Sequence, residues 1–317
     1  MKKIYITMGD PRGVGPEIIF KGLADIFSSG SMGNNVPIVI GNSSLMQKYA
    51  DICGTQISPA ADIDHGKNKT VYFIHRDTTG HPGADSIDYI DTAVRLCRAE
   101  SGNSIVTAPV TKESIAEVRP GFTGHTEYIA GLAGVETVVM VFVSSGIKMS
   151  LMTTHLPLRS VVSVLNSGYI IQHVNIVCDA LKSWYGFTQP RIAICSVNPH
   201  SGEKGIMGNE ESELLELPLK TLRDKGVDIT GPLGAYEALK RTVEGEYDFL
   251  ISIYHDQVLS GAKVFLGPLV NVTAGLPFIR TSPDHGPAID ISGKDMADYR
   301  SMKAALELAA RISENTG

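Results

Sequence analysis

Short apolar runs alternate with amphipathic stretches along the whole chain. This alternation is the signature of an α/β fold, in which helices cover a mainly parallel sheet. We expect strands at Lys3–Met8, Val36–Ile40, Val71–Ile74, Ser104–Ala108, Arg191–Val197 and Phe249–Tyr254, and a hairpin of Thr137–Val143 and Lys148–Thr153. We expect helices at Pro16–Phe27, Asp88–Ala99, Ser167–Trp184, Asn209–Gly226 (bent at Pro218) and Met296–Ile312.

Length and charge restrict the classes of protein that remain. A chain of 317 residues is long for one sheet-and-helix unit and short for three, so two lobes are expected. The net charge of −6 and the lack of a basic tract argue against nucleic acid as a partner. With 43% hydrophobic and 20% charged residues, the composition is that of a folded protein.

The cysteines and the uncharged runs point to the cytoplasm. The four cysteines show no CxxC spacing, which predicts buried, reduced thiols and neither a zinc ribbon nor a disulfide framework. The N-terminus has no apolar stretch long enough for a signal peptide. Two uncharged runs, Ile26–Gln47 and Ser160–Cys178, are interrupted by polar residues that lipid disfavours. We therefore expect a cytoplasmic protein without a membrane partner.

A glycine-rich turn, GDPRGVGPE, follows the first expected strand from Gly9 to Glu17. Such a turn before a helix can present backbone N–H groups to a phosphate, or can be only a tight structural turn. Ile18 stands where the dinucleotide fingerprint requires a third glycine, and the next strand runs into Gly41 without an acidic residue. A Rossmann-type cofactor site is therefore not predicted here.

Three histidines follow the ends of separate apolar runs: His155 in SLMTTHLP, His200 in AICSVNPH and His255 in LISIYHDQ. In α/β sheets, ligands bind beyond the carboxyl ends of the strands. Neutral imidazole is a common metal ligand, so a shared metal site is one interpretation. Separate surface or capping roles are the other.

Three more residues are candidates for substrate contact. His125, in GFTGHTEY, either caps a helix together with Thr126 or contacts substrate. Arg280, between an apolar strand and a Ser-Pro-Asp turn, suits bidentate binding of carboxylate or phosphate, with a surface salt bridge as the alternative. Lys263 is a candidate for phosphate contact or proton transfer, although most lysines are simply solvated.

The sequence blocks MGDPRGVGPEI, TAPVTKE, FTGHTE, NPHSGE, MGNEE, YHDQ and NVTAGLPFIRTSPDHG together resemble the 4-hydroxythreonine-4-phosphate dehydrogenase family. This family includes the pyridoxal phosphate biosynthesis enzyme and relatives that act on D-threonate and D-erythronate 4-phosphate. The blocks occur in order from residue 3 to about residue 300.

The resemblance implies a fold similar to isocitrate and isopropylmalate dehydrogenases, with two α/β lobes and a cleft between them. The first lobe would comprise residues 1–128 and 272–317, and the second residues 129–271. It implies a homodimer with the active site at the interface, NAD held without a Rossmann motif, and a divalent metal: zinc, magnesium, cobalt, manganese or nickel.

Carried over by motif, the resemblance assigns the site residues. Metal ligands would be His155, His200 and His255, contributed by both subunits. Substrate would contact His125, Thr126, Lys263, Asn271 and Arg280, and Lys263 is our candidate base. The turn of Asp284, His285 and Gly286 would lie near the adenosine end of NAD.

The expected reaction is the NAD-dependent oxidation and decarboxylation of 4-phosphohydroxy-L-threonine to 3-amino-2-oxopropyl phosphate and CO2. The alternatives are a D-threonate or D-erythronate 4-phosphate dehydrogenase, a metal-dependent hydrolase or aldolase without NAD, and a sugar-phosphate binding protein. Three departures from the family pattern bear on the substrate. Tyr236 stands where an aspartate is usual, Val258 and Ser260 follow YHDQ, and the segment from Lys263 to Asn271 is about one residue short.

Overall fold

The computed structural model describes residues 1–63 and 69–316, which form two compact units. The first comprises residues 1–138 and 270–317, and the second residues 139–269. The chain therefore leaves the first unit once and returns to it. The structure groups residues 129–138 and 270–271 with the first unit, whereas the sequence analysis expects them in the second lobe. Helix α5 (His125–Ala133) runs across the expected boundary, and Tyr128 in it donates to Asp91 of the first unit at 2.7 Å.

The first unit is a mainly parallel sheet in the order β3-β4-β2-β1-β5-β12-β11, in which only β11 runs antiparallel to its neighbour β12. Its strands are β1 Lys3–Thr7, β2 Val36–Gly41, β3 Gln56–Pro59, β4 Thr70–His75, β5 Ser104–Thr107, β11 Val270–Ala274 and β12 Ile279–Pro283. Strands β1, β2 and β5 are almost wholly buried, as the apolar runs predict.

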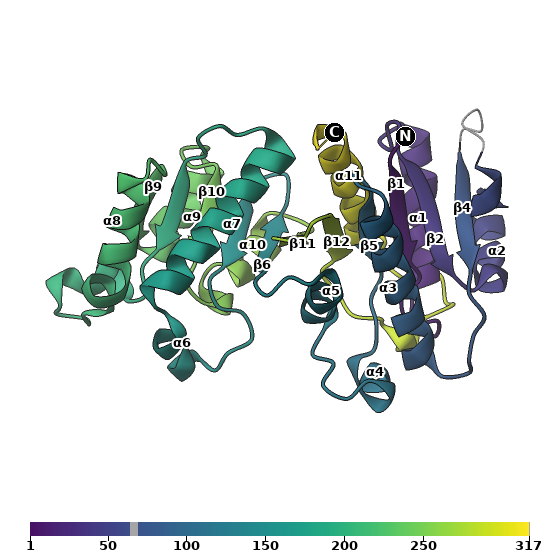
Figure 1. Cartoon of the computed structure of the whole chain (residues 1–317), viewed down its shortest axis with the longest axis horizontal. Helices are drawn as coiled ribbons and strands as arrows, with labels where there is room; N and C mark the ends of the chain where they lie inside the picture. Colours follow the sequence, from purple (N-terminus) through teal and green to yellow (C-terminus); the bar gives the residue numbers. More distant parts are fainter. Residues whose placement is uncertain (64–68, 317) are drawn as a thin grey trace. The chain divides into compact units, whose positions relative to one another are not determined.

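Helices cover the sheet of the first unit (Figure 1). They are α1 Gly15–Ser29, α2 Ser43–Ile52, α3 Pro82–Ala99, α4 Lys112–Val118, α5 and α11 Arg300–Asn315, with short 3-10 turns at Ala60–Asp62 and Ile289–Ile291. Helix α1 packs against α11, and α3 packs against α4 and α5. Helix α1 begins with a proline in its first turn and ends at Gly30, whose φ of 76° is left-handed.

The second unit has the strand order β6-β7-β10-β8-β9. Its strands are β6 Val139–Val143, β7 Lys148–Leu151, β8 Ile192–Cys195, β9 Ile229–Leu233 and β10 Phe249–Ser252. Strands β6 and β7 form the predicted antiparallel hairpin, while β7, β10, β8 and β9 are parallel. Strand β9 was not predicted, because its ITGPL sequence lacks an apolar run.

The helices of the second unit are α6 Leu158–Val164, α7 Ser167–Tyr185, α8 Glu216–Asp224, α9 Ala235–Val243 and α10 Leu259–Phe265, with 3-10 turns at Pro199–Lys204 and His255–Gln257 and a π-helical turn at Glu211–Leu215. Helices α7, α8 and α9 pack on the strands of its sheet (Figure 1). The helix expected over Asn209–Gly226 consists of this π-helical turn followed by α8, and Pro218 lies in the first turn of α8. Proline has no N–H to continue the regular helical ladder.

The structure tests the predictions of buried cysteine thiols and of uncharged runs that do not span a membrane. Buried thiols are confirmed for Cys97 and Cys195, but the prediction is wrong for Cys53 and Cys178, which are half-buried. Among the described residues, no single helix has the length and apolar character needed to cross a membrane. One pair, α6 and α7, meets the length and composition criteria only together and is bent by 93° at the break between them.

Candidate functional site

Three loops meet at one edge of the sheet of the first unit. Strands β1, β5 and β12 are parallel neighbours, so the turns that follow them lie side by side. The glycine-rich turn is joined to both other turns by backbone hydrogen bonds. Asp10 N donates to Pro109 O at 3.0 Å, and Val14 N donates to Pro287 O at 2.9 Å.

Close backbone approaches account for the glycines of the first turn. A Cβ on Gly15 would lie 2.1 Å from Met8 O, and one on Gly13 would lie 2.8 Å from Pro287 O. Neither contact is compatible with a side chain. Within the turn, the buried carboxylate of Asp10 accepts hydrogen bonds from Arg12 and Thr111. Burial alone would raise the pKa of this carboxyl, but the hydrogen bonds outweigh burial and lower the pKa below its usual value. The glycines therefore have a structural role at this edge.

A cavity of about 190 Å³ opens beside these turns. It is lined by Thr107, Ala108, Pro109, Val110, Lys112, Gly124, His125, Arg280, Ser282, Pro283, His285 and Gly286. Two predicted substrate residues, His125 and Arg280, are thus brought together, although 155 positions separate them in the sequence (280 − 125). Two residues of the predicted cofactor turn, His285 and Gly286, line the same cavity.

Arg280 is a buried cation without an acidic partner. Its side chain is 3% exposed, and its guanidinium donates to Thr107 Oγ1 of β5 at 2.7 and 3.2 Å and to Thr273 Oγ1 of β11 at 3.2 Å. No ion pair to Arg280 occurs among the described residues. Burial lowers its pKa to about 10, and the charge of Glu127 opposes this shift. The group remains charged near neutral pH, so it can attract an anion into the cavity.

His125 is the first residue of α5, and the helix is capped by Gly124 without a side-chain hydrogen bond. The capping interpretation of His125 and Thr126 is therefore wrong for their side chains. His125 Nε2 is buried and has no hydrogen-bond partner among the described residues. Burial, reinforced by the positive charges of Arg280 and Lys112, lowers the pKa of His125 to about 3. His125 is thus a neutral imidazole with an unused ring nitrogen.

Lys112 adds a second cation to the cavity and was not predicted. It is the first residue of α4, and its Nζ would lie 3.7 Å from a Cβ on Gly124. The TAPVTKE block contains it, directly after β5, so its position at a strand end was the available signal. Asn271 lies on β11 opposite Ser282 of β12, and its Oδ1 is buried without a partner in the part of the chain that is described.

The second unit brings the ends of β7, β10 and β8 together. These strands are adjacent and parallel, so His155, His255 and His200 follow three neighbouring strand ends. The rings of His155 and His255 have their centroids 5.7 Å apart, with an angle of 38° between the ring planes. Within residues 1–63 and 69–316, no three His, Cys, Asp or Glu side chains lie close enough to hold a metal together. His200 lies on the neighbouring loop and does not complete such a group.

The chemistry of these donors fits a divalent transition metal. His255 Nδ1 lies 3.0 Å from Asp256 Oδ1, an arrangement that fixes the imidazole and leaves Nε2 for a ligand. Three imidazoles are a donor set that zinc, cobalt and nickel accept readily, and manganese and magnesium less so.

Side-chain hydrogen bonds connect the three histidine loops. Gln257 Nε2 donates to Ser196 O after β8 at 2.6 Å, while its Oε1 accepts from Ile253 N after β10 at 2.7 Å. Thr153, after β7, donates its hydroxyl to Ile253 O at 2.8 Å. The structural role of Gln257 in YHDQ is not predictable from the sequence pattern, because these hydrogen bonds depend on which strands are neighbours.

A second cavity of about 550 Å³ adjoins His200 and includes Tyr236 among its lining residues. Tyr236 is the second residue of α9 and is 79% exposed. It shares the cavity with Tyr254 and Gln257. The departure from the family pattern at Tyr236 therefore lies beside a predicted metal ligand. Lys263 is an exposed residue of α10 in the same unit, and its charge contributes to the lowered pKa of Asp256.

The predicted cofactor turn is held at its first residue and open at its last. Asp284 N donates to Ser301 Oγ of α11 at 3.2 Å. His285 is exposed, and a Cβ added to Gly286 would meet nothing within 4 Å. An open turn beside the cavity fits one end of an extended cofactor such as NAD.

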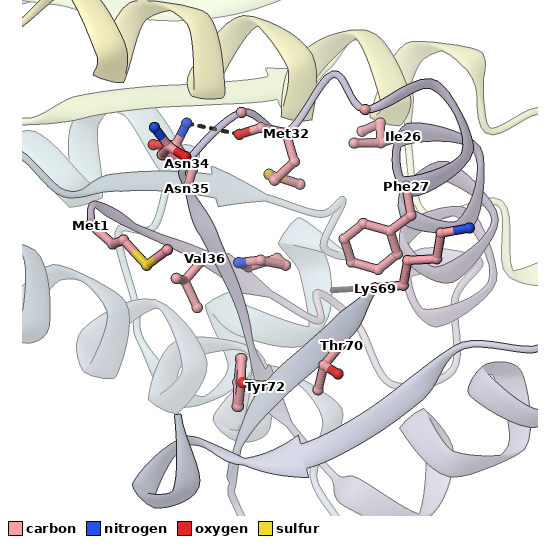
Figure 2. Close-up of a pocket in the computed structure, with 13 residues that line it drawn as sticks. Met1, Ile26, Phe27, Met32, Asn34, Asn35, Val36, Lys69, Thr70 and Tyr72 are labelled. Atoms are coloured by element: carbon pink, nitrogen blue, oxygen red, sulfur yellow. Dashed lines mark hydrogen bonds between the residues drawn. The ribbon is translucent and has the colours of Figure 1, made fainter. Parts of the chain in front are cut away.

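Figure 2 shows another hollow of the first unit, of about 450 Å³, where strands β2 and β4 begin. Phe27, Met32, Val36 and Tyr72 line it, and Asn35 donates to Met32 O at 3.0 Å. It contains no predicted site residue. The cavity that His125, Arg280, His285 and Gly286 line lies instead beside the turns that follow β1, β5 and β12, as the rule for α/β sheets requires.

The fold is that of an α/β protein, and Arg280 and Lys112 place positive charge at the cavity of its first unit. Comparison with known proteins gives the family: the model described as pyridoxal phosphate biosynthetic protein PdxA matches residues 34–309. The chain belongs to the PdxA family, and it is a dehydrogenase. The predicted family resemblance is thereby confirmed.

Named relatives cover nearly the whole chain. A 4-hydroxythreonine-4-phosphate dehydrogenase of Sulfurihydrogenibium sp. is 34% identical over 98% of this chain and 98% of its own length. A D-threonate 4-phosphate dehydrogenase of Cupriavidus necator is 35% identical over 98% of this chain and 97% of its own. The crystal structure of 4-hydroxythreonine-4-phosphate dehydrogenase from Klebsiella pneumoniae matches with a TM-score of 0.87 at 31% identity, covering 99% and 100% of the two chains. The α/β fold class is confirmed.

Proposed function

We propose that the protein catalyses the NAD-dependent, divalent-metal-dependent oxidation and decarboxylation of 4-phosphohydroxy-L-threonine to 3-amino-2-oxopropyl phosphate and CO2. The observation that carries this proposal is Arg280, a buried guanidinium whose hydrogen bonds in the described chain go to threonine hydroxyls. A substrate phosphate or carboxylate supplies the charged hydrogen-bond partner that the threonine hydroxyls do not provide.

The residues around Arg280 have complementary roles in holding such a substrate. The neutral imidazole of His125 forms a hydrogen bond with a substrate oxygen through Nε2, which has no partner in the described structure. Thr126 and Asn271 supply further polar contacts, and Lys112 adds positive charge at the cavity. Binding at several points orients the substrate, and orientation is itself a large part of catalysis.

His155, His200 and His255 would hold the metal, and Asp284, His285 and Gly286 would contact NAD. When bound, the metal supplies Lewis acidity to the substrate hydroxyl, and NAD supplies the hydride acceptor. Lys263 is the candidate base that removes the proton from the C3 hydroxyl oxygen while the hydride leaves C3, with phosphate binding as its competing role. The bond between C1 and C2 of the 3-keto acid then breaks to release CO2, and a proton from solvent is added at C2 to give the ketone product.

We propose further that the enzyme is a cytoplasmic homodimer with its active site at the subunit interface. The exposed apolar side chains of Val264 and Phe265, next to Lys263 on α10, support a partner surface in the second unit. Sedimentation of the purified protein tests the dimer. A monomer at all concentrations that are active in the assay would contradict it.

The experiment that tests the function is NADH formation by metal-loaded protein with 4-phosphohydroxy-L-threonine, D-threonate 4-phosphate and D-erythronate 4-phosphate. Turnover of the first substrate alone supports the proposal. Alanine at His155, His200 or His255 is expected to remove bound metal and activity together, and full turnover of such a variant without metal would refute the metal site. Metal binding without NAD binding would favour a hydrolase or aldolase.

Tyr236 favours one alternative substrate class. It lines the cavity beside His200, where the family usually has an acidic residue. A neutral phenol in place of a carboxylate removes a partner for a substrate ammonium group and retains a hydrogen-bonding hydroxyl. This substitution favours a 2-hydroxy acid such as D-threonate 4-phosphate, and preference for that substrate in the assay would assign the enzyme to sugar-acid catabolism.

A further inference from the structure

We propose that Glu211 is a positioning residue that holds the loop carrying His200 in the conformation required for metal binding. The inference rests on the proposed role of His200 as a metal ligand. It assigns a function to a buried carboxylate that makes no contact with substrate or cofactor in the mechanism above. Glu211 is 8% exposed and is the first residue of the π-helical turn before α8.

The loop that carries His200 has an unfavourable backbone conformation. His200, Ser201, Glu203 and Lys204 all have left-handed φ angles, between 43° and 57°. Left-handed backbone is disfavoured for residues with a side chain, and four such residues within five positions require compensating interactions. The residues around them must therefore hold the loop in place.

The Glu211 carboxylate makes hydrogen bonds at the point where the loop leaves β8. Its Oε1 accepts from Val197 N at 2.9 Å and from Asn198 N at 2.7 Å, and its Oε2 accepts from Asn198 Nδ2 at 3.1 Å. Asn198 Nδ2 also donates to Glu210 Oε2 at 2.6 Å. All these donors lie two or three positions before His200. The carboxylate therefore fixes the direction in which the chain enters the left-handed segment.

The same carboxylate also touches the centre of the loop. A Cβ on Gly202 would lie 2.6 Å from Glu211 Oε2, so the backbone of Gly202 packs directly on the carboxylate. Gly202 O accepts from Gly205 N and Met207 N, which closes the loop beyond it. Glu211 thus contacts the loop on both sides of His200.

The hydrogen bonds require an anion that only accepts. All three groups that point at Glu211 are N–H donors, so a Glu211→Gln side chain would turn an N–H toward at least one of them or lose that bond. The substitution preserves size and shape. It is therefore a specific probe of the hydrogen bonds, and Glu213→Gln, at an exposed position in the same π-helical turn, is the matched control.

The test is Co²⁺ binding by the full-length protein, followed through the visible d–d absorption bands. We expect E211Q to weaken Co²⁺ binding about tenfold to hundredfold and to alter the bands, and E213Q to leave both unchanged. Unchanged Co²⁺ binding by E211Q, or an equal loss in E211Q and E213Q, would overturn the inference.

A second measurement does not depend on metal. Amide hydrogen exchange at Val197 and Asn198 should be about tenfold or more faster in E211Q than in the wild type or E213Q. Equal protection in all three proteins would also overturn the positioning role. If the wild type bound no Co²⁺ but E211Q showed faster exchange, the metal assignment of the proposed function would fail while the effect of Glu211 on the loop would stand.

Discussion

The cationic cavity of the first unit and the histidine loops of the second are built in different ways. Arg280 lies on a central strand and is fixed by hydroxyls from the strands on both sides. His155 and His200 are exposed and lie on loops beyond the strand ends, where side chain–backbone hydrogen bonds determine the path of the chain. One site is preformed by the sheet itself, and the other depends on the hydrogen bonds that hold its loops.

This difference has opposite consequences for stability. A buried cation without an acidic partner destabilises the fold, since its desolvation is only partly compensated by neutral hydroxyls. The hydrogen bonds of the histidine loops stabilise the fold, because they satisfy backbone groups after β8 and β10. In the first unit, a mutation that weakens substrate binding should therefore preserve or raise the stability of the fold. In the second unit, a mutation that weakens metal binding should also lower the stability.

Replacing Arg280 by methionine should have the largest effect on activity. Loss of the buried guanidinium should lower kcat/KM about a thousandfold, which corresponds to ~4 kcal/mol. The free energy of unfolding should stay equal or rise, because the uncompensated charge is removed. Steady-state kinetics and urea unfolding measure the two effects. Arg191→Met is the control: Arg191 is paired with Asp248, so its loss should lower stability and leave activity intact. Reduced stability of R280M with normal KM would contradict the comparison.

Replacing Gln257 by leucine tests the second unit. The change removes the hydrogen bonds to Ser196 O and Ile253 N, and both backbone groups then lack their partner. We expect metal affinity to fall about tenfold to hundredfold and the free energy of unfolding to fall by about 2 kcal/mol. Calorimetric metal titration and urea unfolding test this. Gln47→Leu, at an exposed position in α2, should change neither quantity, and metal affinity retained in Q257L would mean that the histidine loops are preformed after all.

The pH dependence of stability should have a contribution from His173 of the second unit. Burial lowers the pKa of this imidazole to about 3, and its Nε2 lies 2.9 Å from Ser150 Oγ. The unfolded chain takes up a proton near pH 6.5 while the folded chain does not, so stability is lost as the pH falls from 6.5 toward 3. Between pH 6.5 and 5 the loss is roughly 2 kcal/mol. Urea unfolding at pH 7 and pH 5 gives the change in the free energy of unfolding between these two pH values. This change should be smaller in His173→Phe than in the wild type by that amount, and an equal change in both proteins would refute the assignment.

The sequence predicts most of the framework, because the apolar runs that define the strands do not depend on distant residues. Strands β1, β2, β5, β8 and β10 and the β6–β7 hairpin lie where expected. The approach of His155 to His255 follows from the same pattern, since both residues lie after parallel strands.

What the sequence does not predict depends on tertiary contacts. The left-handed backbone at His200 and the hydrogen bonds of Glu211 and Gln257 exist only because particular loops are adjacent. Strand order decides that adjacency, and no local pattern records it. For Lys112 the sequence indicates the position after β5, but its approach to Gly124, 12 positions further along the chain (124 − 112), is again a tertiary contact.

Replacing Lys112 by methionine should have the smallest effect. It tests whether Lys112 contacts the bound anion or only adds positive charge to the empty cavity. If the cation contributes to anion binding, KM should rise about tenfold, or ~1.4 kcal/mol, with little change in kcat. The positive charge of Lys112 helps to lower the pKa of His125, so that pKa should rise in K112M, which an NMR titration of His125 can follow. Lys220→Met, on α8 of the second unit, should change neither quantity. A higher His125 pKa with unchanged KM would show that Lys112 acts on the empty cavity but makes no contact with the bound substrate, leaving recognition to the strand-borne Arg280.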